Sequence, residues 1–306
     1  MVNASSTSPP FSRKESTVEY NITRDFDDFQ VYDWPICILT ALSCLCGLVG
    51  NSLVIWLLGF CIKRNPLTTY ILNLAIADFG TLLGLSTRFI FECIIPYPDL
   101  SVAFPIVYAF ILFTYCSSLY LLTAISLERC LSVLFPIWYR CHRPEKSSAV
   151  VSSFMWIISG LLAGMMLVSE VYLSLESLLK AVNTMFGVNL LIFTPMLVAS
   201  TLIMSIKICR SSQRRQPPRL YTAILVTLLF FIIFAIPLSA SHLIVLNTDY
   251  FSSTGWESAF LFASFNSSIN PIIYYFVGRD RKKCRESLKV VLKRVFRDEA
   301  ISQGGA

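Results

Sequence analysis

Hydrophobic residues gather into seven long runs along the chain, and short polar connectors separate them. An α-helix needs roughly 20 apolar residues to cross the hydrocarbon core of a bilayer, and each run reaches that length. The start of the fifth run is less distinct than the others, because the polar residues Lys180 and Asn183 lie there. The predicted spans cover residues 34–61, 67–93, 102–134, 147–170, 181–209, 218–246 and 255–276. The pattern therefore predicts an all-α membrane protein built as a seven-transmembrane helix bundle.

Two polar segments flank this predicted domain of residues 34–276. Residues 1–33 are polar and acidic and contain no apolar stretch of the kind found in a signal peptide. Residues 277–306 are basic, with apolar side chains at helical spacing. The residues expected to face lipid there are Leu288, Val291, Leu292, Val295 and Phe296. This spacing predicts an amphipathic helix on the inner leaflet, with Cys284 as a candidate palmitoylation site; a solvated basic tail is the alternative.

Composition and charge agree with a membrane protein and give its orientation. The chain is 55% hydrophobic and 14% charged, with a mean hydropathy of +0.64, whereas soluble domains carry about 25% charged residues. Most of the 25 lysines and arginines fall in connectors that share one side of the membrane, which is the cytoplasmic side by the positive-inside rule. We therefore expect a multi-pass plasma-membrane protein with its N-terminus outside, and the net charge of +6 does not indicate nucleic-acid binding.

Cysteines and glycosylation sequences fit the same topology. Most of the ten cysteines lie in apolar runs or in basic segments, so they do not form a disulfide scaffold. Cys37 and Cys93 are the thiols near the outer face, and they are a candidate pair. Asn3 and Asn21 begin N-glycosylation sequences in the predicted extracellular tail.

Several polar side chains lie inside the predicted spans, where each is costly unless it has a partner or a function. Asn51 is in the first span, Asp78 in the second, Ser118 in the third, and Asn266 and Asn270 in the seventh. If the helices bring them together, they offer a carboxylate, a hydroxyl and amide oxygens to a small hard cation such as sodium. A hydrogen-bonded network without an ion is equally compatible with these residues.

Two further features suggest moving parts. Pro271 removes a backbone donor in the seventh span and frees a carbonyl, which favours a kink. Glu128 and Arg129 lie at the inner end of the third span. Arg129 either extends its charge to the membrane surface or takes part, with Glu128, in a contact that forms and breaks.

These residues occur in an order that resembles a rhodopsin-like G-protein-coupled receptor. The matching positions are G-N-S-L-V at 50–54, L-A-I-A-D at 74–78, E-R-C at 128–130, Trp156, Pro195, Pro237 and N-P-I-I-Y at 270–274. Within that class the chain resembles Mas and the Mas-related receptors. The segments that carry this closer likeness are residues 128–144, 234–237, 266–278 and 286–299.

The resemblance implies a role for each motif. It implies a sodium ion in the inactive state at Asp78 and Ser118, with Asn266 and Asn270 nearby. It implies a G-protein switch and an activation hinge. The switch residues would be Glu128, Arg129 and Tyr274, and the hinge residues Asn270, Pro271, Pro237 and Phe234. The implied partners are heterotrimeric G proteins of the Gq or Gi type, with arrestin as a further candidate.

The chain also departs from the usual receptor pattern. Phe104 occupies the third-span position of the usual outer disulfide, and residues 165–190 contain no cysteine. Ala235 replaces the usual tryptophan of the sixth span, and Ile203 replaces the usual tyrosine of the fifth. We therefore expect a shallow ligand pocket, and weakened switch contacts suggest activity without ligand.

Charge at the outer face suggests the ligand class. Ile111 stands where amine receptors place an aspartate, and the seventh span has no lysine for a retinal Schiff base. The candidate ligand contacts are Glu92, Glu170, Asp249 and Glu257. Acidic side chains attract cations, so we expect a basic peptide or another cationic ligand. The alternatives are solvated acids with no such role, a lipid or neutral ligand, and a constitutively active receptor.

Other classes of membrane protein fit less well. A transporter or channel predicts repeated halves or a continuous polar pathway, whereas the polar residues here have one focus around Asp78. A membrane enzyme needs a nucleophile–base pair or metal ligands, and His142 and His242 fall on opposite sides of the membrane. We expect no enzyme and no cofactor, apart from the candidate sodium ion.

Overall fold

A computed structural model describes much of the predicted bundle. The described residues are 34–62, 65–94, 103–144, 146–173, 175–210, 225–230, 232–233, 253–278 and 290–291. Every regular element within these ranges is a helix. The sequence expectations at Asn3, Asn21, Phe234, Pro237, Asp249 and Cys284 lie outside the described residues.

The helices follow the predicted spans closely. The elements are α2 (Trp34–Trp56), η2 (Leu57–Cys61), α3 (Pro66–Ile94), α4 (Ala103–Leu134), α5 (Pro136–His142), α6 (Ser147–Tyr172), α7 (Leu175–Val188), η4 (Asn189–Phe193), α8 (Thr194–Arg210) and α10 (Ser253–Gly278). Here η2 and η4 are single π-helical turns that continue their neighbours. Five helical segments are long and apolar enough to cross a membrane, and they match the first five predicted spans. The seventh predicted span is α10, and the sixth is described at residues 225–230 and 232–233.

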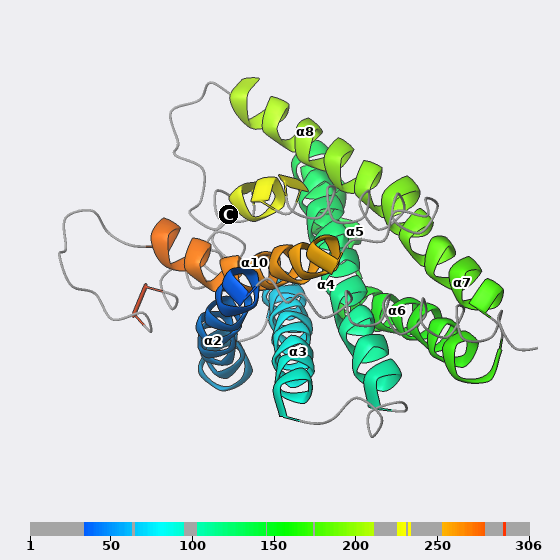
Figure 1. Cartoon of the computed structure of the whole chain (residues 1–306). Helices are drawn as coiled ribbons and strands as arrows, with labels where there is room; N and C mark the ends of the chain where they lie inside the picture. Colours follow the sequence, from blue (N-terminus) through cyan, green and yellow to red (C-terminus); the bar gives the residue numbers. More distant parts are fainter. Residues whose placement is uncertain are drawn as a thin grey trace, which may run out of the picture.

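The central helix of the arrangement is α4. It packs against α3, α6 and α8, while α10 packs against α2 and α3 (Figure 1). In α4, 83% of the most apolar stretch is buried, against 22% in α6. A helix that is apolar on every face suits this interior position, and a helix at the rim needs only one face toward its neighbours.

The rim helices present apolar side chains outward. On α6 the exposed residues recur every three or four positions and form one stripe: Val150, Phe154, Ile157, Leu161, Met165 and Val168. In water such a stripe would require a protein partner, whereas lipid chains solvate it directly. The stripe therefore marks the lipid-facing side of α6.

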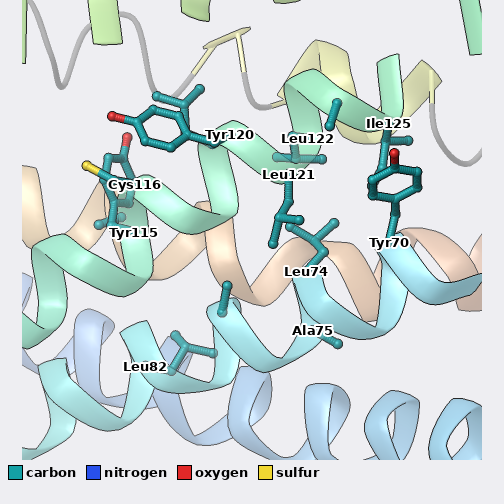
Figure 2. Packing of buried hydrophobic residues seen from close by; sticks show 14 of the residues in the cluster. Tyr70, Leu74, Ala75, Leu82, Tyr115, Cys116, Tyr120, Leu121, Leu122 and Ile125 are labelled. Atoms are coloured by element: carbon teal, nitrogen blue, oxygen red, sulfur yellow. The ribbon is translucent and has the colours of Figure 1, made fainter. Parts of the chain in front are cut away.

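The interface between α3 and α4 forms a large part of the core. Tyr70, Leu74 and Leu82 of α3 belong to one apolar cluster with Leu121 and Leu122 of α4 (Figure 2). Tyr70 and Tyr120 are among the largest fully buried side chains. These contacts fix α3 against α4 and hold the polar residues of both helices at constant separation.

Glycines allow the close approach of α2 to α10. A Cβ atom on Gly47 would lie 2.3 Å from Oγ of Ser268, and one on Gly50 would lie 2.9 Å from Cβ of Pro271. Small residues permit this backbone approach in membrane bundles, where packing rather than water drives association. The glycines therefore bring Asn51 within reach of the proline kink in α10.

Two segments differ from the sequence expectation. The helix of the fifth segment begins at Leu175, and its stretch apolar enough to cross a membrane begins at Glu176, before the predicted start at residue 181. Lys180 Nζ lies 2.6 Å from Glu176 Oε1, so an i,i+4 ion pair accommodates both charges on the first turns. In the C-terminal segment Val291 is buried within the protein, and its neighbour Val290 is exposed.

Candidate functional site

A buried carboxylate lies at the centre of the bundle. Asp78 of α3 has no exposed surface. Ser118 Oγ of α4 donates a hydrogen bond to Asp78 Oδ1 at 2.7 Å, and Asn270 Nδ2 of α10 donates one to Oδ2 at 2.6 Å. Three helices that are far apart in sequence thus converge on one side chain and bring Asp78, Ser118 and Asn270 together.

Asn51 repairs the backbone defect that Pro271 creates. Proline has no N–H, so the carbonyl of Ser267, four residues earlier, loses its helical donor. Asn51 Nδ2 donates to that carbonyl at 3.0 Å and also to the carbonyl of Gly47 at 3.0 Å. The amide of α2 therefore replaces the missing donor and ties α2 to the weak point of α10.

The remaining polar atoms near Asp78 determine whether a cation fits. Asn270 Oδ1 and Ser267 Oγ are buried and have no hydrogen-bond partner among the described residues. The Ser267 hydroxyl lies close to the Asp78 carboxylate, although not at hydrogen-bond geometry. Asn266 is also buried, but it does not donate to Asp78 in the described structure. A carboxylate, two hydroxyls and an amide oxygen form the donor set that a hard cation prefers, so sodium fits these residues.

An ion cluster links α3 to α10 near their outer ends. Arg88 Nη2 lies 2.6 Å from Glu92 Oε1 and 2.7 Å from Glu257 Oε1. The Arg88 guanidinium also lies 3.9 Å from the ring centroid of Phe260, a cation–π contact. Two of the predicted ligand contacts, Glu92 and Glu257, are therefore already paired within the protein.

Sequence reasoning missed Arg88, although a signal was present. Arg88 lies within the second span, where an ionisable side chain indicates a partner or a function. Glu92 is four residues further along the same helix, which is the spacing of a helical ion pair. The pairing with Glu257, 169 residues away, has no such local signal.

The candidate disulfide between Cys37 and Cys93 is not formed in the structure, where both cysteines are free thiols. Cys37 is buried, and its thiol donates to Glu257 Oε2 at 3.5 Å, whereas Cys93 is exposed. Cys37 thus points toward α10, because the Glu257 carboxylate offers its thiol a buried acceptor.

Glu170 is the other predicted ligand contact that the structure describes. It lies in the last turn of α6, and its Oε2 atom is buried without a hydrogen-bond partner among the described residues. Its charge acts on Tyr108 of α4. Unlike Glu92 and Glu257, Glu170 therefore keeps one carboxylate oxygen without a hydrogen-bond partner among the described residues.

A second missed cluster surrounds the π-helical turn of the fifth segment. Tyr120 Oη donates to Asn189 Oδ1 at 2.7 Å, and Asn189 Nδ2 donates to Cys116 Sγ at 3.4 Å. The Tyr120 ring stacks on Phe193 with centroids 3.7 Å apart. This buried asparagine fixes η4 against α4. Asn189 lies inside an apolar segment, where an amide is costly without a partner. The sequence therefore carried a signal for a polar contact at this position.

The inner end of α4 carries the predicted switch residues. Arg129 is buried, and Tyr274 of α10 is buried within electrostatic range of Asp78. Glu128 Oε1 accepts a hydrogen bond from Tyr139 Oη at 2.8 Å and forms an ion pair with Arg143 Nε. Burial raises the pKa of the Tyr139 phenol, and the Glu128 carboxylate raises it further, so Tyr139 remains a donor at neutral pH.

Comparison with known proteins places this geometry in a family. Residues 50–274 match the model of the 7 transmembrane receptor (rhodopsin family). The chain belongs to this family. Human Proto-oncogene Mas is 41% identical over 266 residues, which cover 83% of this chain and 80% of the human protein. Mouse Proto-oncogene Mas is 39% identical over 282 residues, covering 88% of this chain and 84% of the mouse protein.

Mas-related receptors are similar as well. Human Mas-related G-protein coupled receptor member X1 is 39% identical over 284 residues, which cover 88% of this chain and 86% of that protein. Together these matches confirm the predicted resemblance and the seven-transmembrane fold. The protein is a multi-pass plasma-membrane receptor of the Mas type. Its partners are a G protein and an extracellular ligand, and it is not an enzyme.

The repair of the Pro271 defect by Asn51 can be tested in this receptor with a double-mutant cycle. Asn51→Ala leaves the buried carbonyl of Ser267 without a donor, which costs about 1–3 kcal/mol. Pro271→Ala returns an N–H to that carbonyl. We expect Asn51→Ala to lower the melting temperature of the purified receptor clearly in the native background, and by less than half as much in the Pro271→Ala background. Equal losses in both backgrounds would show that the Asn51 amide does not serve this carbonyl.

Proposed function

We propose that this receptor senses a basic peptide or another cationic ligand outside the cell and activates G proteins of the Gq or Gi type. The observation that carries the ligand class is Glu170, whose buried carboxylate oxygen lacks a partner in the described structure. The proposal places the N-terminus outside, as the distribution of lysine and arginine predicts. The end of α6 that holds Glu170 then faces the extracellular side.

Burial makes Glu170 a selective contact. An ionised carboxylate removed from water is unfavourable unless a cation or hydrogen-bond donors compensate it. A guanidinium or ammonium group on a ligand supplies both the charge and the donors. Arg88 already neutralises Glu92 and Glu257 in part, so these two acids add to the field at the outer face but offer less to a ligand.

The inner surface supports a protein partner at the other end. The short helix α5 follows α4 directly, and its Ile137 side chain is 79% exposed. Phe135, the residue before α5, is also exposed. Exposed apolar side chains between α4 and α6 form a surface that a G protein can cover.

Glu170→Gln tests the ligand class. It keeps the shape of the side chain and removes its charge, so we expect a basic amphipathic peptide to lose about 10–100-fold in potency, which corresponds to about 1.5–3 kcal/mol for a hydrogen bond to a charged group. The matched control is Glu176→Gln, because Glu176 is exposed and pairs with Lys180. The measurement is the dose response of G-protein activation at matched surface expression.

Two outcomes would contradict the assignment of Glu170. One is an unchanged peptide dose response, and the other is an equal shift in the Glu176→Gln control. Activation by a lipid or a neutral molecule alone, with a potency that Glu170→Gln does not change, would favour the alternative ligand class.

We also propose that sodium binds at Asp78 and Ser118 in the inactive receptor. The support is the converging oxygen set and the two buried unpartnered atoms, Ser267 Oγ and Asn270 Oδ1. A sodium ion would neutralise a carboxylate that otherwise has only hydrogen-bond donors around it. It would also link α3, α4 and α10 more firmly than the hydrogen bonds alone.

Sodium binding predicts a cation-specific effect on stability. We expect the ligand-free receptor to melt at a higher temperature in sodium chloride than in potassium chloride of equal concentration, since a ligand of the native state stabilises it. Asp78→Asn should abolish the difference between the two salts. A wild-type receptor with equal melting temperatures in both salts would exclude the site.

A further inference from the structure

Arg88 joins α3 to the outer end of α10 through two contacts. Its Nη2 atom lies 2.7 Å from Glu257 Oε1, and its guanidinium lies 3.9 Å from the ring centroid of Phe260, one helical turn further along α10. The side chains of Arg88 and Glu257 are 15% and 11% exposed, so solvent screens their attraction little. The contacts among Arg88, Glu257 and Phe260 are called the outer latch below.

The helix α2 meets the outer latch as well. The Cys37 thiol of α2 donates to Glu257 Oε2 at 3.5 Å, so this carboxylate has a charged donor on one oxygen and a weak donor on the other. Three neighbouring helices, α2, α3 and α10, therefore meet at Glu257 (Figure 1). Cys37 is 4% exposed. Movement of the Glu257 carboxylate away from α2 would uncover this thiol.

The charges around the outer latch are unequal in number. Arg88 also pairs with Glu92, four residues further along its own helix, at 2.6 Å. One guanidinium nitrogen therefore serves two carboxylates. If Arg88 released Glu257, it would keep Glu92, whereas Glu257 would be left facing the thiol of Cys37. An incoming guanidinium or ammonium group at Glu257 would then provide one cation for each carboxylate.

One continuous helix connects the outer latch to the buried polar network. Glu257 lies near the outer end of α10, and Asn270 lies further along the same helix. Asn270 Nδ2 donates to Asp78 Oδ2 of α3 at 2.6 Å. Contacts at two levels therefore hold α10 against α3, an ion pair at the outer end and a hydrogen bond in the middle. Pro271, next to the inner contact, is the weak point at which the helix can bend.

We propose that Arg88 is a positioning residue that latches α10 to α3, and that a cationic ligand opens this latch by pairing with Glu257 in place of Arg88. The opening step rests on the cationic ligand class proposed above, whereas the latch rests on the contacts within the protein. Opening frees the outer part of α10 to move relative to α3. Weakening of the latch without a ligand should therefore raise the basal activity of the receptor.

Cys37 is a native reporter of the latch. Its labelling by a membrane-impermeant methanethiosulfonate, followed by peptide mapping of the full receptor in membranes, measures how often Glu257 uncovers the thiol. Arg88→Gln should accelerate this labelling about tenfold, because a charge-assisted hydrogen bond that opposes local opening is lost. A nearby positive charge favours the reactive thiolate, so loss of Arg88 does not itself speed the reaction.

A second variant opens the latch from the other side. Glu257→Gln removes the charge that Arg88 holds on α10, while Arg88 keeps Glu92, so it leaves no buried acid without a partner. It should also accelerate the labelling of Cys37. If Arg88→Gln does not reach the cell surface, Glu257→Gln decides alone.

Controls separate opening of the latch from general loosening of the bundle. Glu92→Gln leaves the contact between Arg88 and Glu257 in place, so the ligand-free labelling rate of Cys37 should remain near that of the wild type. Arg88→Lys retains the charge and should restore much of that rate. Cys44 is buried two helical turns further along α2 and should label no faster in any variant. An unchanged Cys37 rate in Arg88→Gln or Glu257→Gln, or equal acceleration at Cys44, would overturn the latch.

G-protein activation tests whether the latch controls activity. Arg88→Gln should raise activation without ligand about fivefold at matched surface expression, at the low end of measured conformational couplings. Activation at or below the wild-type level, in a variant whose Cys37 labels faster, would show that the latch opens without affecting activity and would overturn the proposal.

The opening step is tested with a lysine-rich amphipathic peptide and the same peptide with glutamine in place of each lysine. The lysine peptide should speed the labelling of Cys37 in the wild-type receptor at the concentrations that activate it, and the glutamine peptide should not. Activation by the lysine peptide without faster labelling would overturn the opening step. If no cationic peptide activates the receptor, the proposed ligand class and the opening step both fail, while the labelling of Arg88→Gln still decides the latch.

Discussion

Hydrocarbon offers no hydrogen bonds, so a buried polar group in this receptor is costly unless it finds a partner within the protein. Pro271 adds one such group, because it leaves the backbone carbonyl of Ser267 without its helical donor. Asn51 supplies the donor from another helix at 3.0 Å. Asn270, the residue before the proline, donates to Asp78, which Ser118 also binds. One helical defect thus organises contacts among α2, α3, α4 and α10.

Charged side chains lie at both ends of the bundle, and their pairing differs between the two ends. At the outer end, Arg88 balances Glu92 and Glu257, while Glu170 retains an oxygen without a partner among the described residues. At the inner end, Arg143 occupies Glu128 beside Arg129. The two ends thus differ, since the acid at the inner end is paired while one acid at the outer end keeps an oxygen without a partner among the described residues. The polar network around Asp78 lies between them.

The sequence was sufficient to locate the membrane spans, because the length of each apolar run follows from the thickness of the bilayer. It also identified Asp78, Ser118 and Asn270, because polar residues in hydrocarbon must have partners. It could not identify the partners of Glu257 or of Glu128, since these depend on how each helix is rotated and where the loop returns. The candidate Cys37–Cys93 pair could not be decided from the sequence for the same reason, since hydropathy places a thiol near the outer face but does not give the direction of its side chain.

The most direct test of the receptor account is nucleotide exchange on Gq and Gi proteins in membranes that contain the wild-type chain or Arg129→Ala. Reactions would be run without ligand and with basic amphipathic peptides, at matched surface expression. The account predicts exchange above that of membranes without the receptor, and its loss in Arg129→Ala. Exchange that persists in the variant, or none with the wild-type chain under any condition, would contradict it.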